Sequence, residues 1–128
     1  MNDAKQQERF RASEEDNTRK RAALLGLQYF DSRGVSQTTP LVNDILSIEE
    51  MYKGYLVPLR DDENEPLTFA IANNTPQSLL RTLREHYATR NVQFVLMSNL
   101  GFREFMLRYD PPKTIVYDDV KIARKGDS

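Results

Sequence analysis

The sequence predicts an α+β domain in which helices cover a small mixed β-sheet and a further helix precedes that sheet. Three observations lead to this fold class. Segments with apolar residues at helical spacing alternate with short runs rich in β-branched and aromatic residues. Two such runs, residues 56–60 and 67–72, flank a charged turn, which is typical of a β-hairpin. A helical segment separates the hairpin from the next run, so the sheet must also contain a helical crossover.

The N-terminal part predicts a disordered lead, a helix and a short strand. Residues 1–12 are polar, with Phe10 as their only large apolar side chain, and are expected to be disordered. Ser13 can then cap a helix in which acidic residues precede basic ones, an order that complements the helix dipole. Gly26 is placed to end this helix. Residues 27–30 follow as a short apolar and aromatic strand.

Two short helices are predicted before the hairpin. Thr39 and Pro40 form an N-cap and first-turn pair, and apolar residues recur at helical spacing over residues 41–46. Ser47 and Glu50 have the spacing of a capping box, which predicts a second helix directly after Ser47. The inner face of this second helix is expected to carry Ile48, Met51, Tyr52 and Tyr55.

The second half of the chain predicts a helix, a strand and a last helix. Asn74 or Thr75 should cap a helix that starts at Pro76, and residues 91–97 alternate as a strand with two apolar faces. Ser98 or Asn99 should cap the last helix. The apolar side chains of the two helices are Leu79, Leu80, Leu83 and Tyr87, then Phe102, Phe105, Met106 and Tyr109.

The C-terminal tail is predicted to leave the domain. Prolines 111 and 112 end the last helix, since proline cannot continue it. Residues 114–117 are expected to form an edge strand. The predicted organisation is therefore a lead over residues 1–12, one domain over residues 13–110, and an edge strand with a linker over residues 111–128.

Composition excludes several classes of protein. The 18 basic and 19 acidic residues give a net charge of -1, which does not favour a nucleic-acid partner. The chain has no cysteine, so it has no disulfide scaffold and no thiolate zinc site. It also lacks the roughly 18 consecutive apolar residues of a membrane span and the apolar region of a secretory signal. A cytoplasmic location is therefore expected.

Motifs that carry catalytic chemistry are missing. The sequence contains no phosphate-binding loop, and its five glycines are scattered singly. His86 is the sole histidine, without the partners that a metal site or a catalytic triad needs. The acidic residues of turn 61–66 lack the glycine and distal glutamate of a calcium-binding loop. We therefore expect no enzymatic activity, bound metal or cofactor in this chain.

The remaining candidate residues are expected to serve a partner-binding surface. Basic residues recur on the two later helices, and they form either a solvated face with local ion pairs or a docking surface for an acidic partner. The aromatic residues mostly have core spacing, which argues against a nucleic-acid stacking platform. The partner-binding candidates are Phe10, Arg81, Arg84, Arg103 and Arg108.

Three blocks resemble, in order and spacing, the N-terminal domain of type II secretion and type IV pilus assembly ATPases. Residues 25–31, LGLQYFD, are similar to the family's LGLPYVDL opening, although Gln28 replaces its preferred proline. Residues 48–59, IEEMYKGYLVPL, resemble its IPEELARRYRVVPL segment, with Tyr55 one position from the usual tyrosine. Residues 67–76, LTFAIANNTP, look like its LTVAMADPLD segment.

The resemblance implies a docking domain of a larger motor. The ATPase core, with its ATP and Mg²⁺, would lie beyond Ser128, and the tail would be the linker toward it. The family forms hexameric motors at the cytoplasmic face of the membrane, and its N-terminal domain contacts membrane-platform proteins.

A second hypothesis is a domain that senses a nucleotide second messenger. Some relatives bind cyclic di-GMP through paired motifs upstream of the LGLPYVDL block, and the arginine-bearing first helix followed by Leu25 and Gly26 motivates this alternative. The upstream segment is too short for the pair of motifs. An enzyme with a carboxylate-only site is a third hypothesis, for which no pair of residues can be nominated.

Overall fold

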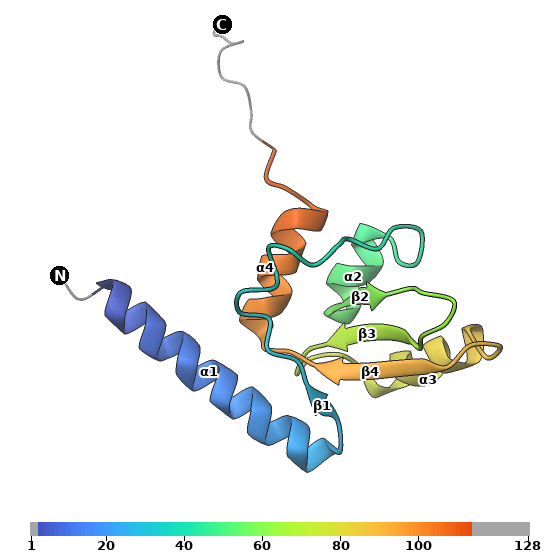
Figure 1. Cartoon of the computed structure of the whole chain (residues 1–128), viewed down its shortest axis with the longest axis horizontal. Coiled ribbons are helices and arrows are strands. Elements are labelled where there is room, and N and C mark those ends of the chain that lie inside the picture. Colours follow the sequence, from blue (N-terminus) through green and yellow to red (C-terminus); the bar gives the residue numbers. More distant parts are fainter. Residues whose placement is uncertain (1–2, 114–128) are drawn as a thin grey trace, which may run out of the picture.

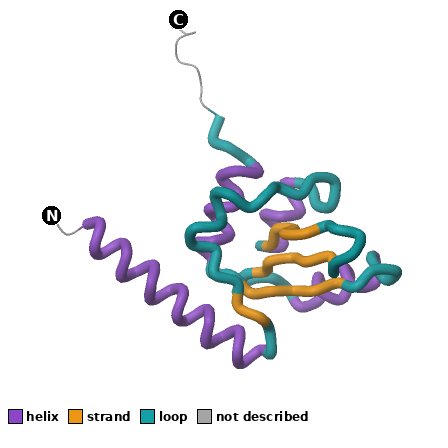
Figure 2. The backbone as a smooth tube through the Cα atoms, in the orientation of Figure 1, coloured by secondary structure: helices purple, strands orange, loops and turns teal. Residues whose placement is uncertain are grey.

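The computed structural model describes residues 3–113, and Figures 1 and 2 show helices arranged around one β-sheet. This arrangement confirms the predicted α+β class. The elements are α1 (Asp3–Leu25), β1 (Gln28–Tyr29), α2 (Ile48–Gly54), β2 (Leu56–Arg60), β3 (Leu67–Ile71), α3 (Gln77–His86), β4 (Val92–Leu96) and α4 (Asn99–Tyr109). The predicted edge strand over residues 114–117 lies outside the described residues.

The sheet contains the predicted hairpin and the predicted crossover. Its strand order is β1-β4-β3-β2. Strands β2 and β3 pair antiparallel across the charged turn, whereas β3 and β4 pair parallel and are joined through α3. The two-residue β1 pairs parallel with β4, so that Gln28 lies opposite Val95. The strands β1, β3 and β4 therefore point the same way, and β2 forms one edge of the sheet.

A hydrophobic cluster covers each face of the sheet. Alternate residues of β4 point to opposite clusters, as predicted: Phe94 and Leu96 to one, and Val95 to the other. Helices α2 and α4 cover one face, while α3 and the end of α1 cover the other (Figure 1). The first cluster contains Met51, Val57, Ala70, Ala72, Val95, Met97, Phe102, Phe105 and Met106, and the second contains Ala22, Leu56, Leu67, Phe69, Ile71, Leu83, Phe94 and Leu96.

The predicted disordered lead is wrong for residues 3–12, which form the first turns of α1. Ser13 lies inside this helix and does not cap it. The N-terminal turns are built from good helix formers without an apolar stripe, so their sequence pattern resembles that of a disordered segment. Residues 3–10 are all exposed. The end of α1 is as predicted, because Gly26 follows it with a positive φ of 72°.

The predicted helix over residues 41–46 is also wrong, because this segment is an irregular loop. Asp44 has a φ of 70°, which breaks any helix there. Tertiary contacts satisfy the backbone instead: the hydroxyl of Tyr109 accepts a hydrogen bond from the Val42 amide at 2.9 Å. The next prediction is confirmed, since Ser47 and Glu50 form the reciprocal capping box of α2.

Two further local predictions need correction. Thr75 does not cap α3, because its hydroxyl accepts from the Ala72 amide and donates to the Tyr55 carbonyl; Pro76 is the N-cap, without a side-chain hydrogen bond. Tyr52 and Tyr55 lie at the margin of the inner face of α2, since they are 46% and 40% exposed while their rings contact Phe102 of α4. Ser98 does cap α4, as expected, by accepting from the Gly101 amide.

Candidate functional site

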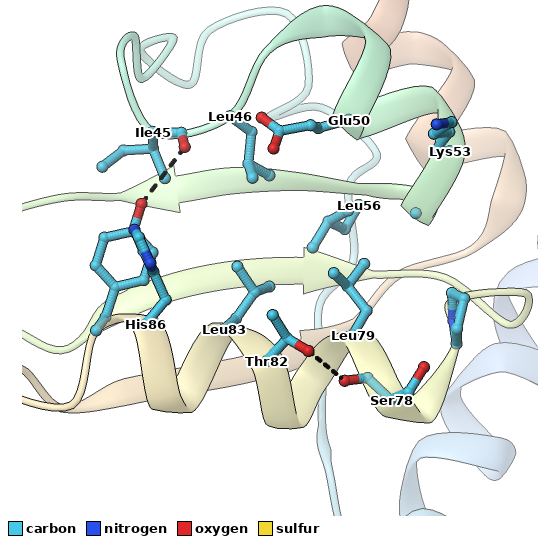
Figure 3. Close-up of a pocket in the computed structure, with 13 residues that line it drawn as sticks. Ile45, Leu46, Glu50, Lys53, Leu56, Ser78, Leu79, Thr82, Leu83 and His86 are labelled. Carbon is cyan, nitrogen blue, oxygen red and sulfur yellow. Dashed lines mark hydrogen bonds between the residues drawn. The ribbon is translucent and has the colours of Figure 1, made fainter.

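The candidate site is an apolar groove between α2 and α3, which we call the α2–α3 groove. It has a volume of about 480 Å³ and lies over the edge strand β2 (Figure 3). Helix α2 and the loop before it form one wall, and the apolar face of α3 forms the other. The floor and walls carry Ile45, Leu46, Leu56, Leu79, Leu83 and Tyr87.

Gly54, the last residue of α2, gives the groove its depth at that end. A Cβ atom added at Gly54 would overlap the Leu79 side chain and lie 2.6 Å from Cδ2 of Leu56. A side chain at this position would therefore displace the ends of the Leu79 and Leu56 side chains. Leu56 is fully buried beneath the groove, whereas Leu79 is partly exposed within it.

Polar side chains line the rim of the groove. Glu50 and Lys53 come from α2, and Ser78, Thr82 and His86 come from α3 (Figure 3). Glu50 is already used in the capping box, and Thr82 donates to the Ser78 carbonyl within α3. Lys53 forms no ion pair with any residue in the described range. An apolar floor with a sparse polar rim suits the binding of an apolar segment from another protein.

The two walls are tied together across the groove at one end. The hydroxyl of Tyr87 donates to the Ile45 carbonyl at 3.4 Å, and the rings of His86 and Tyr87 meet edge to face at 4.6 Å between centroids. His86 is therefore an exposed neighbour of a packed tyrosine. Over residues 3–113, no group of three His, Cys, Asp or Glu side chains is placed to hold a metal ion.

The five predicted partner-binding residues do not come together on one surface. Arg81 and Arg84 lie on α3, and Arg103 and Arg108 lie on α4, which packs on the opposite face of the sheet. Phe10 is 58% exposed on the projecting half of α1. None of the five lines the α2–α3 groove. Sequence spacing identified helical residues correctly but could not assign the two helices to different faces.

Two of these arginines have structural contacts. Arg108 is half-buried and donates to the carbonyls of Ser36 and Thr39 at 2.8 and 2.6 Å. It therefore holds the loop between β1 and α2 against α4. The guanidinium of Arg84 lies 4.8 Å from the centre of the Phe94 ring, a cation–π contact. Arg81 and Arg103 are exposed.

A buried polar cluster that the sequence did not predict joins α1 to the body of the domain. Glu15 is only 1% exposed, and its carboxylate accepts hydrogen bonds from Arg11 at 2.6 Å, from Ser98 at 2.5 Å and from the Tyr29 hydroxyl. Arg11 also donates to Glu104 of α4 at 2.6 Å. The only sequence signal was the i, i+4 spacing of Arg11 and Glu15, because the other partners are far along the chain.

The electrostatics of this cluster favour a structural role. The hydrogen bond to Glu104 raises the pKa of Arg11, against the opposing effect of partial burial. Burial, and then the hydrogen bond to Glu15, raises the pKa of the Tyr29 hydroxyl. Both groups therefore keep their protons at neutral pH. Every charged member has a hydrogen-bonded partner, so the cluster stabilises the packing of α1.

Comparisons with protein-family models, with curated proteins and with solved structures found no significant match. The resemblance to secretion and pilus ATPases therefore stays a prediction. No helix in the described part of the chain is long and apolar enough to cross a membrane.

Proposed function

We propose that this chain is a non-catalytic docking domain of a type II secretion or type IV pilus assembly ATPase. In this role it links the hexameric motor, at the cytoplasmic face of the membrane, to a membrane-platform protein. The observation that carries the proposal is the α2–α3 groove, an apolar hollow with a polar rim on the surface of the domain. The three sequence blocks that resemble the ATPase family supply the identity of the motor.

The groove suits one kind of occupant, an amphipathic helix of the platform protein. Such helices place aliphatic side chains from successive turns into an apolar groove between two elements of the receptor. Leu46, Leu79 and Leu83 would receive these side chains. An acidic residue beside them on the helix would meet Lys53, which is the rim cation without an ion-pair partner in residues 3–113.

The proposal is tested by measuring the binding of the purified cytoplasmic domain of a platform protein by calorimetry. A transient docking interface predicts a dissociation constant of about tens of micromolar or below. Absence of binding at those concentrations would contradict the proposed function.

A matched pair of substitutions tests the groove itself. Ser78→Arg places a long charged side chain at the rim of the groove, while Ser13→Arg makes the same change at an exposed position of α1. We expect Ser78→Arg to weaken binding about tenfold or more, because steric blocking and desolvation of the new charge oppose docking. Ser13→Arg should leave binding unchanged. Equal effects of the two substitutions would place the interface elsewhere.

A further inference from the structure

A second cavity, which we call the α1–α3 crevice, lies between the C-terminal end of α1 and helix α3. It also has a volume of about 480 Å³ and opens against the sheet face that carries Phe94 and Leu96. It shares no lining residue with the α2–α3 groove. The end of β3 and the start of α3 close one side of it, through Ile71 and Gln77.

The charge in the α1–α3 crevice has one sign. Arg21 from α1 and Arg84 from α3 line it, and no aspartate or glutamate does. Within residues 3–113 neither guanidinium forms an ion pair or a side-chain hydrogen bond. Asn73 and Gln77 add neutral amide groups. Two unpaired cations beside one hollow repel each other and attract an anion.

The position of Arg84 is restrained, and this favours recognition of a carboxylate. Its contact with the Phe94 ring, at 4.8 Å, holds the planar guanidinium on the wall of the crevice. A guanidinium fixed in this way loses little side-chain entropy when it binds a carboxylate through two parallel hydrogen bonds. The apolar part of the lining, Leu27, Leu80 and Leu96, provides space for an aliphatic side chain next to the bound carboxylate.

We propose that the α1–α3 crevice binds an acidic segment of a partner protein, with carboxylates on Arg21 and Arg84 and an aliphatic side chain between them. The inference does not depend on the α2–α3 groove. A guanine dinucleotide fits the lining less well. Its bases need an aromatic face for stacking, but Phe94 is only 4% exposed and Arg84 covers it. Guanine also donates N–H groups from one edge, and the crevice has no carboxylate to accept these hydrogen bonds.

The test uses a short fluorescent peptide of alternating glutamate and leucine, and fluorescence anisotropy with the full chain. A peptide of alternating glutamine and leucine is the charge control. We expect the acidic peptide to bind more tightly than its control and to lose affinity as salt rises. The double variant Arg21→Glu with Arg84→Glu should lose affinity for the acidic peptide by about tenfold or more. Arg103→Glu, the same change on the opposite face of the sheet, should bind like the wild type.

Several outcomes would overturn the inference. The first is equal binding of the two peptides, and the second is a loss of binding in Arg103→Glu as large as that in the double variant. The third is displacement of the peptide by cyclic di-GMP, together with loss of dinucleotide binding in the double variant. If loss of the Phe94 contact unfolds the double variant, Arg21→Glu alone must still weaken binding severalfold, because Arg21 is exposed on α1. Ser78→Arg must not weaken peptide binding, which separates this site from the α2–α3 groove.

Discussion

Glu15 joins α1 to β1 and to the start of α4. Its carboxylate bonds to Arg11 of the same helix, to Tyr29 of β1 and to Ser98, which in turn caps α4. A buried carboxylate is stable only when such partners replace water. The orientation of α1 therefore depends on a few hydrogen bonds to this one residue.

Replacing Glu15 by alanine should lower the free energy of unfolding by about 3 kcal/mol, because Arg11, Tyr29 and Ser98 lose a buried partner. Urea denaturation measures this change. Glu14→Ala is the control, since the Glu14 side chain has no polar contact in the described part of the chain, and it should change stability by about 0.5 kcal/mol at most. Similar losses in both variants would argue that helix propensity, and not the cluster, explains the effect.

Asp31 and Arg33 should make acid stability depend on pH. The hydrogen bonds from Arg33 hold the pKa of Asp31 below its ordinary value. A carboxyl group whose pKa is lowered on folding adds stability above its unfolded pKa, about 3.9, and loses that stability as pH falls through the folded pKa. Both side chains are largely exposed, so solvent screening limits the contribution to about 1 kcal/mol or less.

The variant Asp31→Asn should therefore have a lower free energy of unfolding than the wild type at pH 7. The two values should become equal below about pH 3, where Asp31 is protonated. Urea unfolding at a series of pH values measures the difference. Arg33→Gln should remove the same increment, and combining the two changes should add little further. A difference that persists at the lowest pH would assign the effect to the loop conformation and not to the charge pair.

At the scale of elements, α1 has two halves with different roles. Residues 3–10 are exposed along their whole length and project beyond the body of the domain (Figure 1). From Arg11 onward the helix packs, but its buried side chains are Glu15, Thr18 and Ala22, of which only Ala22 is apolar. Polar contacts, and not a hydrophobic stripe, hold this helix in place.

Truncation of α1 should separate the two halves. A chain that begins at Arg11 should keep the wild-type melting temperature, since only exposed residues are lost. A chain that begins at Asn17 loses Arg11 and Glu15, and its melting temperature should fall by about 10 °C. Thermal unfolding followed by circular dichroism compares them. A large fall in the first variant would show that the N-terminal turns also stabilise the fold.

At the scale of the whole molecule, the sheet divides the interior into two layers. Phe69 belongs to one cluster and Phe105 to the other, and both are almost completely buried. Leu46, which is partly buried, packs against both clusters. Because the sheet separates the buried residues of the two clusters, the two layers should respond almost independently to substitutions.

Phe69→Leu and Phe105→Leu should each lower the free energy of unfolding by about 1–2 kcal/mol, because a smaller side chain leaves a void in a packed layer. The double variant should equal the sum within about 0.5 kcal/mol, as expected for sites in separate clusters. Chemical denaturation of the four proteins measures this. An interaction energy above about 1 kcal/mol would mean that strain passes through the sheet.

The sequence by itself determined the α+β class, the hairpin, and most of the helices and strands after residue 47. In these segments local propensity, apolar spacing and capping agree with the packed structure, as they do at Ser47 and Ser98. It also named Arg84 among five partner-binding candidates, which stays a prediction.

Only the tertiary structure decided how these elements meet. The packing of α1 and the path of the loop over residues 41–46 depend on contacts with α4, which lies more than fifty residues away in sequence. Apolar spacing also shows which face of a helix is buried but not which face of the sheet it covers, so it could not separate Arg81 and Arg84 from Arg103 and Arg108. The α2–α3 groove arises where α2, β2 and α3 converge at Gly54, a juxtaposition that no local pattern encodes.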